Sequence, residues 1–193
     1  RPSSLELPPG RGVELRDDME QLVEELRSAI PAAFESEDYQ TRKQELQEEY
    51  QDKQEEALNT IQEKAKERGI ALIRTPVGLA FAPVEEGEVV SPDEFQQLPD
   101  EKREQVKGDI AQLQEELQET MRQARLWERE TRGKVKELNR QVAMLAVGHR
   151  IQELQAKYAD LQPVVDYLEA VKTDVVENVE TFRKTGEEET EAV

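Results

Sequence analysis

Residues 99–158, PDEKREQVKGDIAQLQEELQETMRQARLWERETRGKVKELNRQVAMLAVGHRIQELQAKY, are the stretch that decides the fold. Apolar or small residues recur along it at spacings of four and three, and the polar Lys134 and Gln141 interrupt the series. Its members are Val106, Ile110, Leu113, Leu117, Thr120, Ala124, Trp127, Thr131, Leu138, Val142 and Leu145. This period predicts one helix, about 90 Å long, whose apolar stripe is covered by other helices.

Three glycines interrupt this predicted helix, at Gly108, Gly133 and Gly148. Each weakens a helix by about 1 kcal/mol relative to alanine. We therefore expect them to mark bends or places where a neighbour approaches closely, with the break at Gly148.

The segments before the long helix predict its covering partners. Residues 1–12, RPSSLELPPGRG, are rich in proline and glycine and predict an extended strap. A helix follows from Val13 to a stop at Pro31, and the apolar residues of its inner face are Leu15, Met19, Leu22, Val23, Leu26 and Ile30. Ser36 is placed to cap a second helix, which spans residues 36–68 and ends at Gly69.

The second helix has a thin apolar seam, with eleven acidic and six basic residues in 35–68. Its inward residues are Tyr39, Leu46, Tyr50, Ala57, Leu58, Ile61 and Ala65. Such a helix is marginal alone, so we expect it to lie antiparallel to residues 99–131, where Leu113 and Leu117 supply apolar surface.

Residues 69–98 predict a small β element at the distal end of this long hairpin. Ile70–Ile73, Val77–Ala82 and Val89–Val90 read as short strands, with a turn at Glu86-Gly87. Ser91-Pro92-Asp93-Glu94 is a capping box that opens a short helix. Two interpretations remain open for its apolar side chains, which either form a minicore or are exposed to grip unfolded polypeptide: Leu79, Phe81, Val84 and Phe95.

The C-terminal part predicts a return helix that begins at Pro163. Its apolar residues recur at threes and fours: Val164, Tyr167, Leu168, Val171, Val175, Val179 and Phe182. Residues 13–35 and 132–185 would then form a basal helical bundle, and residues 186–193 a disordered tail. The predicted fold is mainly α: an elongated antiparallel helical hairpin or coiled coil, with a small β element at the distal end and a helical bundle at the base.

Composition restricts the classes of partner. The chain has 26 basic and 44 acidic residues, a net charge of -18, which opposes binding to nucleic acid or to an anionic membrane. It has no cysteine, and no apolar run approaches the length that spans a bilayer. We therefore expect a soluble, cytoplasmic protein. Because the chain starts at Arg1 with no methionine, we also expect it to be a piece of a larger protein.

Four motifs give the chain a resemblance to a known family. IPAAFESEDYQTR at 30–42 follows LPPGRG and a DMEQLVEELR helix, and RTPVGLAFAPVEEGEVVSPDEFQQLP occupies 74–99. ELNRQVAMLAVGH at 137–149 and YADLQPVVDYLEAVKTDVVENVETF at 158–182 complete the series. Together these motifs resemble Lon-related ATP-dependent proteases, the bacterial Lon-like AAA+ enzymes, in the family's order and over nearly the whole chain.

The resemblance implies a place and a set of partners. The region is similar to a helical insertion of the AAA+ module, between the phosphate-binding loop and the Mg-binding acidic strand, both outside this chain. The parent would bind ATP and Mg, assemble as a homo-oligomeric ring, unfold protein clients and cleave them with a Ser/Lys dyad that also lies outside. We expect this fragment to need no cofactor and to contact unfolded or damaged clients and the rest of the protease.

The residues themselves predict no reaction for the fragment. No G-x-x-x-x-G-K-[ST] sequence is present, and PPGRG lacks the lysine. The five serines lie in predicted straps, caps or helix faces. His149 is the only histidine, so we expect a packed or capping role near a helix bend rather than a triad or a metal site. The abundant carboxylates are interpreted as solvated helix faces.

One flank of the long helix is basic, with Arg122, Arg125, Arg129, Arg132, Lys136 and Arg140. This stripe either contacts an acidic client, an ATPase surface or a nucleic-acid backbone, or is neutralised by acidic residues of the first and last helices, such as Glu24, Asp166 and Asp174. The residues alone indicate a non-catalytic interaction module. A structural coiled-coil or scaffold protein unrelated to proteolysis is the alternative.

Overall fold

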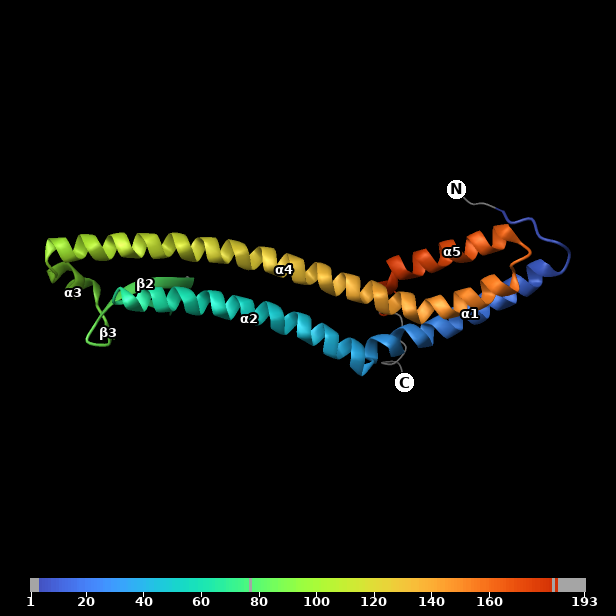
Figure 1. The fold of residues 1–193 in the computed structure, drawn as a ribbon, viewed down its shortest axis with the longest axis horizontal. Helices are drawn as coiled ribbons and strands as arrows, with labels where there is room; N and C mark the ends of the chain where they lie inside the picture. Colours follow the sequence, from blue (N-terminus) through green and yellow to red (C-terminus); the bar gives the residue numbers. More distant parts are fainter. Residues whose placement is uncertain (1–3, 77, 182, 184–193) are drawn as a thin grey trace. The chain divides into compact units, whose positions relative to one another are not determined.

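The computed structural model describes residues 4–76, 78–181 and 183. The chain is mainly α-helical, with a small antiparallel sheet (Figure 1). The helices are α1 (Arg11–Glu35), α2 (Glu37–Glu67), α3 (Pro92–Gln97), α4 (Asp100–Lys157) and α5 (Gln162–Glu177). The strands are β1 (Ile70–Thr75), β2 (Gly78–Glu85) and β3 (Glu88–Val89). The predicted mainly α class with a small β element is confirmed, and so is the single helix across the stretch that decides the fold.

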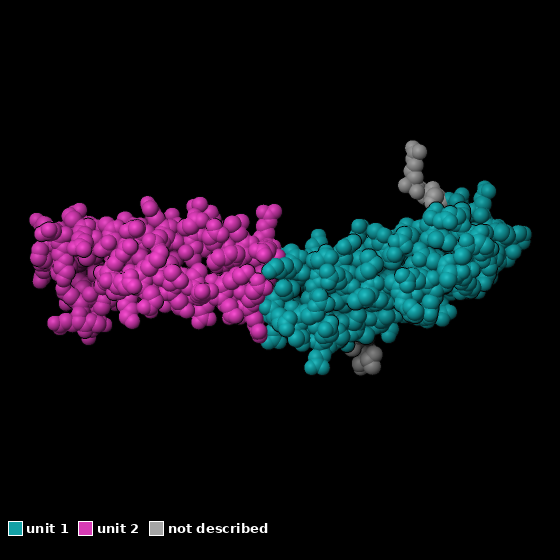
Figure 2. Space-filling model, viewed as in Figure 1, with its two compact units in different colours: residues 1–46, 133–193 teal, residues 47–132 magenta. Residues whose placement is uncertain are grey.

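The chain divides into two compact units (Figure 2). Unit 1 comprises residues 1–46 and 133–193, and unit 2 comprises residues 47–132. The helices α2 and α4 each contribute residues to both.

Unit 1 is a helical bundle of α1, the C-terminal part of α4, and α5 (Figure 1). Its core takes apolar side chains from all three helices, among them Leu26 and Ile30 of α1, Val147 and Ile151 of α4, and Leu168 of α5. All five are at most 2% exposed. At about 25 cal/mol per Å² of apolar surface, this burial is what stabilises helices with so much charge.

Three expectations about α1 are corrected. The helix begins at Arg11, not Val13, so the last two residues of the predicted strap are helical. It also continues through Pro31 to Glu35. Proline removes one backbone hydrogen bond there, but Ile30 and Phe34 on either side are 0% and 3% exposed, and their burial outweighs the lost bond. Val23, predicted on the inner face, is 40% exposed.

The apolar seam of α4 shifts within unit 1. Leu145 was expected in the seam but is 77% exposed, while Ala143 and Val147 are fully buried. Two helices cover α4 here, so its buried face is wider than the seam of a two-helix coiled coil and follows the natural period of the helix. Tyr167 of α5 is likewise 41% exposed, contrary to its predicted place.

The glycines of α4 neither break it nor admit a neighbour. The helix runs without interruption through Gly148. A β-carbon built at Gly108, Gly133 or Gly148 would have no atom within 4 Å other than those of its chain neighbours and its own helix backbone. The predicted break at Gly148 and the close approach of a neighbour are therefore wrong, whereas a bend at these glycines stays a prediction.

Unit 2 pairs α2 with the N-terminal part of α4 in antiparallel directions. Lys64 of α2 forms an ion pair of 2.6 Å with Glu116, and Arg68, just after α2, forms one of 3.7 Å with Asp109. Arg68, the later of these two residues along the chain, meets the earlier residue of α4, so the two helices run antiparallel. The buried cluster between them joins helix and sheet residues: Ile61, Ala65, Ile70, Phe81, Leu113 and Leu117. The prediction that Leu113 and Leu117 complete the thin seam of α2 is confirmed.

The ends of these elements follow the predicted local chemistry. Ser36 Oγ accepts a hydrogen bond of 3.3 Å from the Tyr39 backbone N–H at the start of α2. Gly69 ends that helix with a φ of 68°, which favours glycine. Ser91 and Glu94 form the capping box of α3. Arg103 of α4 donates to the Gln96 carbonyl oxygen at 3.2 Å and so holds α3 against α4.

The three strands form a meander in the order β1-β2-β3. Pairing of β1 with β2 runs from Ile70 opposite Pro83 to Thr75 opposite Gly78. Glu85 lies opposite Glu88, and the turn between them has positive φ at Glu86 (50°) and Gly87 (89°), typical of a tight hairpin. The predictions for Val77, Phe182 and the tail 186–193 lie outside the described residues.

Candidate functional site

The β element of unit 2 has two faces, which the strand register separates. Successive side chains of a strand point to opposite faces, and directly paired residues share a face. Ile70, Leu72 and Arg74 therefore lie on one face with Pro83, Phe81 and Leu79. This is the inner face, because Ile70 and Phe81 belong to the buried cluster and Leu72 packs against it.

Phe81 anchors the hairpin and is not a surface residue. It is 8% exposed and lies in one cluster with Ile61 of α2 and Leu113 of α4. The hypothesis that its ring contacts a client directly is therefore wrong. A buried phenylalanine of this kind instead fixes the position of the strand that carries it.

Leu79 lies on the same face as Phe81, nearer the β1–β2 turn, and it remains 38% exposed. Its direct partner across the strands is Arg74, whose side chain is also exposed. Within the described part of the chain, Arg74 makes no ion pair within 4 Å. The hairpin thus places an exposed leucine beside an unpaired guanidinium.

The outer face of the sheet carries no charged side chain. It consists of Ala71, Ile73 and Thr75 of β1, Gly78, Ala80, Ala82 and Val84 of β2, and Val89 of β3. Val89 is 49% exposed, and Val84 is partly buried. Phe95 of α3 is also partly buried, and neither Val84 nor Phe95 packs against the buried cluster among the described residues. The four predicted residues therefore do not form a single minicore.

The β2–β3 turn and α3 are acidic. Glu85 forms an ion pair of 2.5 Å with Lys102. The backbone N–H and hydroxyl of Ser91 donate to the Glu94 carboxylate and lower its pKa. Glu86 and Glu88 are exposed beside them. This end of the sheet carries the negative charge typical of the whole chain.

The predicted basic stripe is neutralised differently from expectation. Three of its members pair with carboxylates of α4 itself: Arg122 with Glu119 at 3.0 Å, Arg132 with Glu128 at 2.6 Å and Arg140 with Glu137 at 3.7 Å. Side chains three and four residues apart meet on a helix surface, so these pairs need no second helix.

The acidic residues named as partners for the stripe are engaged locally instead. Glu24 pairs with Arg27, Asp166 accepts from Gln162, and Asp174 accepts from Asn178. Within the described residues, Arg125, Arg129 and Lys136 make no ion pair. Whether these three bind a partner stays a prediction.

His149 was expected to be packed or to cap a bend, and it does neither. Its side chain is 79% exposed, and its Nε2 lies 3.3 Å from the Glu153 carboxylate one turn along α4. Because α4 continues past Gly148 to Lys157, His149 caps no helix end.

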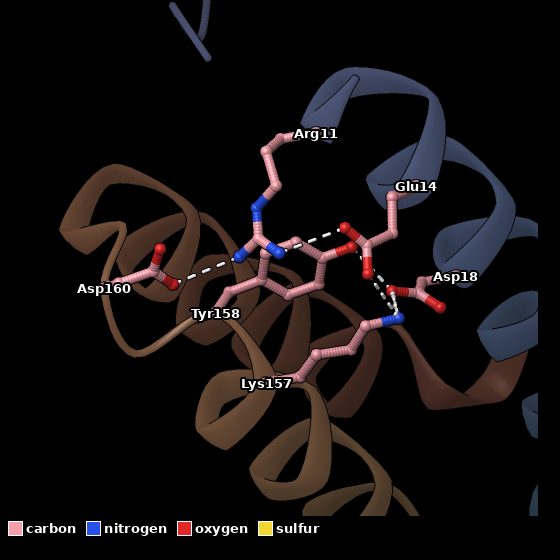
Figure 3. Close-up of polar contacts among 6 residues, drawn as sticks. All are labelled: Arg11, Glu14, Asp18, Lys157, Tyr158 and Asp160. Carbon is pink, nitrogen blue, oxygen red and sulfur yellow. Dashed lines mark hydrogen bonds and ion pairs between the residues drawn. The ribbon is translucent and has the colours of Figure 1, made fainter. Parts of the chain in front are cut away.

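A second polar cluster, in unit 1, joins the first turns of α1 to the corner between α4 and α5 (Figure 3). Arg11 pairs with Glu14 at 3.0 Å and with Asp160 at 3.1 Å, and its guanidinium lies 4.9 Å from the centroid of the Tyr158 ring. Lys157 pairs with Asp18 at 2.7 Å and with Glu14 at 3.2 Å. The Tyr158 hydroxyl donates to Asp18 at 2.6 Å.

This cluster shifts two pKa values in opposite directions. Burial raises the pKa of Tyr158 to about 12, and the hydrogen bond that its hydroxyl donates to Asp18 adds to the shift. Burial also disfavours the charged Asp18, but hydrogen bonds from Lys157 and Tyr158 outweigh it and lower the Asp18 pKa. The cluster thus holds an ionised carboxylate against a neutral phenol, which is a structural arrangement rather than an acid-base pair poised near neutral pH.

Within 4–76, 78–181 and 183, no three acidic, histidine or cysteine side chains gather in a group that could hold a metal ion. None of the helices in that part of the chain is long and apolar enough to cross a membrane.

Comparison with known proteins gives a partial match to a protein family. The family model of the Lon-like LonC helical domain matches residues 1–22. A search of curated proteins finds no significant match. The matched segment includes Arg11, Glu14 and Asp18, the three residues that α1 contributes to the cluster of Figure 3. The chain therefore begins with a segment similar to a Lon-like helical domain.

Sequence reasoning missed the Asp18–Tyr158 contact and the unpaired Arg74. No spacing in the sequence indicates a contact between residues 140 positions apart. Arg74 did carry a signal, because it is the only charge in the strand IALIRT.

Proposed function

We propose that this chain is a helical domain of a Lon-like ATP-dependent protease, that it catalyses no reaction itself, and that its β element contacts unfolded protein clients for the parent enzyme. The LonC helical domain match at residues 1–22 and the mainly α fold support the family part of the proposal. ATP, Mg, the Ser/Lys dyad and the ring would belong to the rest of the parent.

The observation that carries the client-binding part is the exposure of Leu79 beside the buried Phe81. These two residues are one pleat apart on the same face of β2, and they are 38% and 8% exposed. Phe81 fixes the strand to the helices, so Leu79 is presented on a support that does not need Leu79 for its own packing. A rigid support of this kind favours recognition, because little ordering entropy is lost on binding.

Other apolar side chains extend this surface. Val89, on the outer face, is 49% exposed and lies directly opposite the partly buried Val84. An isolated exposed leucine is ordinary, whereas apolar exposure on both faces of one small sheet indicates an interaction surface.

The test is binding of a permanently unfolded protein, reduced and alkylated lactalbumin, to residues 1–193 at two salt concentrations. The Leu79→Ser and Val89→Ser variants are each expected to weaken binding about threefold to fivefold, the effect of losing about 1 kcal/mol of apolar contact. Leu126→Ser is the matched control, because Leu126 is 52% exposed in the same unit but lies on α4. No binding, or equal losses in all three variants, would overturn the client-binding role.

The absence of catalysis has its own assay. The purified chain is expected to hydrolyse neither ATP nor a fluorogenic peptide. Activity that stays with the chain through repeated purification would refute that part of the proposal.

A further inference from the structure

The sheet in unit 2 has two edges. On one of them β3 carries Glu88 and pairs with β2 only at Val84 and Glu85, so residues 78–82 of β2 have no strand partner on that side in the described part of the chain. The β1 edge is six residues long, IALIRT, with no proline and one charge, Arg74. Within residues 4–76 and 78–181, no strand pairs with the other side of β1. Proteins normally blunt such edges with charge, proline, bulges or short length, because an open edge templates the addition of another strand.

The ladder shows which backbone groups this edge offers. The Val84 N–H donates to the Gly69 carbonyl oxygen at 2.8 Å, which makes Gly69 and Val84 a hydrogen-bonded pair. Hydrogen-bonded and non-hydrogen-bonded pairs alternate along an antiparallel ladder. Ala71 and Ile73 therefore bond to β2, whereas the N–H and C=O groups of Leu72 and Arg74 point to the open edge.

The side chains around these groups define what would pair there. Ile73 flanks the edge on the outer face, and Leu79 is exposed on the inner face next to Arg74. The Arg74 guanidinium has no ion-pair partner within the described part of the chain. An added strand would thus meet apolar side chains on both faces and one free cation near the β1–β2 turn.

We propose that the β1 edge binds an extended segment of unfolded polypeptide as a fourth strand, with apolar side chains along it and an acidic side chain facing Arg74. This inference rests on the proposed function and specifies how the client is held. Backbone hydrogen bonds to Leu72 and Arg74 supply affinity that is independent of client sequence, and the flanking side chains supply preference.

A second copy of the chain is the less favoured occupant, because of its charge. Residues 47–132 hold 12 basic and 21 acidic side chains, a net charge of -9, and the whole chain carries -18. Two such units repel each other, whereas a client segment with a single carboxylate opposite Arg74 gains a local attraction.

Hydrogen exchange tests the edge directly, without any substitution. The probe is a capped eight-residue peptide with valine at alternate positions, serine between them and one aspartate. Saturating peptide is expected to slow exchange of the Leu72 and Arg74 amides at least tenfold and to leave Ala71 and Ile73, already bonded to β2, nearly unchanged. Unchanged exchange at both outward amides in a chain that binds the peptide would overturn the proposal.

Substitutions at one residue separate the backbone from the charge. Arg74→Pro removes an outward N–H without breaking the ladder to β2, and proline is tolerated on edge strands. It is expected to weaken peptide binding about tenfold or more, the effect of losing a hydrogen bond and blocking the edge. Arg74→Ala keeps the N–H, so it should weaken binding of the aspartate peptide about threefold and leave a peptide with serine in that place unaffected. Equal affinities of all variants would contradict the assignment.

The outcomes also distinguish this inference from the proposed function. If alkylated lactalbumin binds and depends on Leu79, but the outward amides stay unprotected and Arg74→Pro binds normally, the edge is not the site and the client-binding role stands. If no unfolded protein binds, both fail. Protection of Leu72 and Arg74 that appears with protein concentration and without peptide, together with a dimer in sedimentation velocity, would replace the client by a second copy.

Discussion

The hydroxyl of Tyr158 donates a hydrogen bond of 2.6 Å to Oδ2 of Asp18, and this bond ties the residue after α4 to the first half of α1 (Figure 3). Tyr158 is fully buried, and Asp18 also receives the Lys157 ammonium at 2.7 Å. Asp18 lies within the segment that matches the Lon-like helical domain. The contact therefore joins that segment to the rest of unit 1.

Asp18→Ala is expected to destabilise unit 1 by about 2 kcal/mol, because it leaves a buried phenol without its acceptor. Asp17→Ala is the matched control, since Asp17 is exposed and, among the described residues, forms an ion pair with its neighbour Arg16 alone, at 2.7 Å; its loss should cost under about 0.5 kcal/mol. Urea unfolding at pH 7, followed by circular dichroism, measures both. Equal effects would show that the cluster contributes nothing specific.

The Asp18 carboxylate should also make the stability of unit 1 depend on pH in the acid range. The Asp18 pKa is lowered in the folded chain, so its contribution is present above the pKa of the unfolded chain and is lost as pH falls through the folded value. The stability difference between the wild-type chain and Asp18→Ala should therefore be constant near neutral pH and shrink below about pH 4. A difference independent of pH down to pH 2 would contradict the assigned pKa shift.

Tyr158 should make the stability of the chain depend on pH in the alkaline range. Its pKa is raised to about 12 in the folded chain, so its stabilising contribution is intact below about pH 10 and is lost as pH rises toward 12. Burial also raises the pKa of Tyr39, so the step that belongs to Tyr158, expected near pH 12 in absorbance titration at 295 nm, is identified by its loss on substitution. That step should be missing in Tyr158→Phe, and a titration in which all four ionise near pH 10 would refute it.

Substitutions of Phe81 and of Leu79 should differ in their effect on the stability of unit 2, because the two side chains differ in burial. Phe81→Ala is expected to destabilise unit 2 by about 3 kcal/mol through a cavity, and Leu79→Ala by under about 1 kcal/mol. Trp127, the only tryptophan, lies in unit 2, so its fluorescence in urea follows the unit concerned. Comparable losses for both variants would mean that Leu79 is part of the packing and not a presented side chain.

Helices, caps and turns that depend on neighbouring residues could be predicted from the sequence. Which face of a helix is buried could not. The period of α4, the cap at Ser36, the turn at Glu86-Gly87 and the capping box at Ser91 each rest on neighbouring residues, and each was predicted. Leu145 was misplaced because the buried face depends on how many helices cover α4. A local rule also failed at Pro31, where burial of the flanking side chains outweighs one missing hydrogen bond.

For the candidate site, the sequence predicts the strand that carries Leu79 and Phe81 but not which of these side chains is exposed. Leu79 and Phe81 share a face in any register, since they are two residues apart, so sequence could not show that one is anchored and the other exposed. Which of the two side chains is buried depends on where α2 and α4 pack against the strand. Phe81 lies in the cluster with residues of both helices and Leu79 does not, and this packing is a tertiary property. The open edge of β1 likewise depends on sheet order, which local patterns do not encode.

Two glycines give a final prediction of opposite sign. Gly148→Ala should stabilise the chain by about 0.5–1 kcal/mol, because Gly148 lies inside α4 and nothing within 4 Å would meet the added β-carbon. Gly87→Ala should destabilise it by about 1 kcal/mol, although that β-carbon also meets nothing, because φ at Gly87 is 89° and alanine is strained there. Thermal unfolding of the two variants gives both signs. Destabilisation by Gly148→Ala would mean that α4 bends or receives a neighbour at that position after all, as the sequence first suggested.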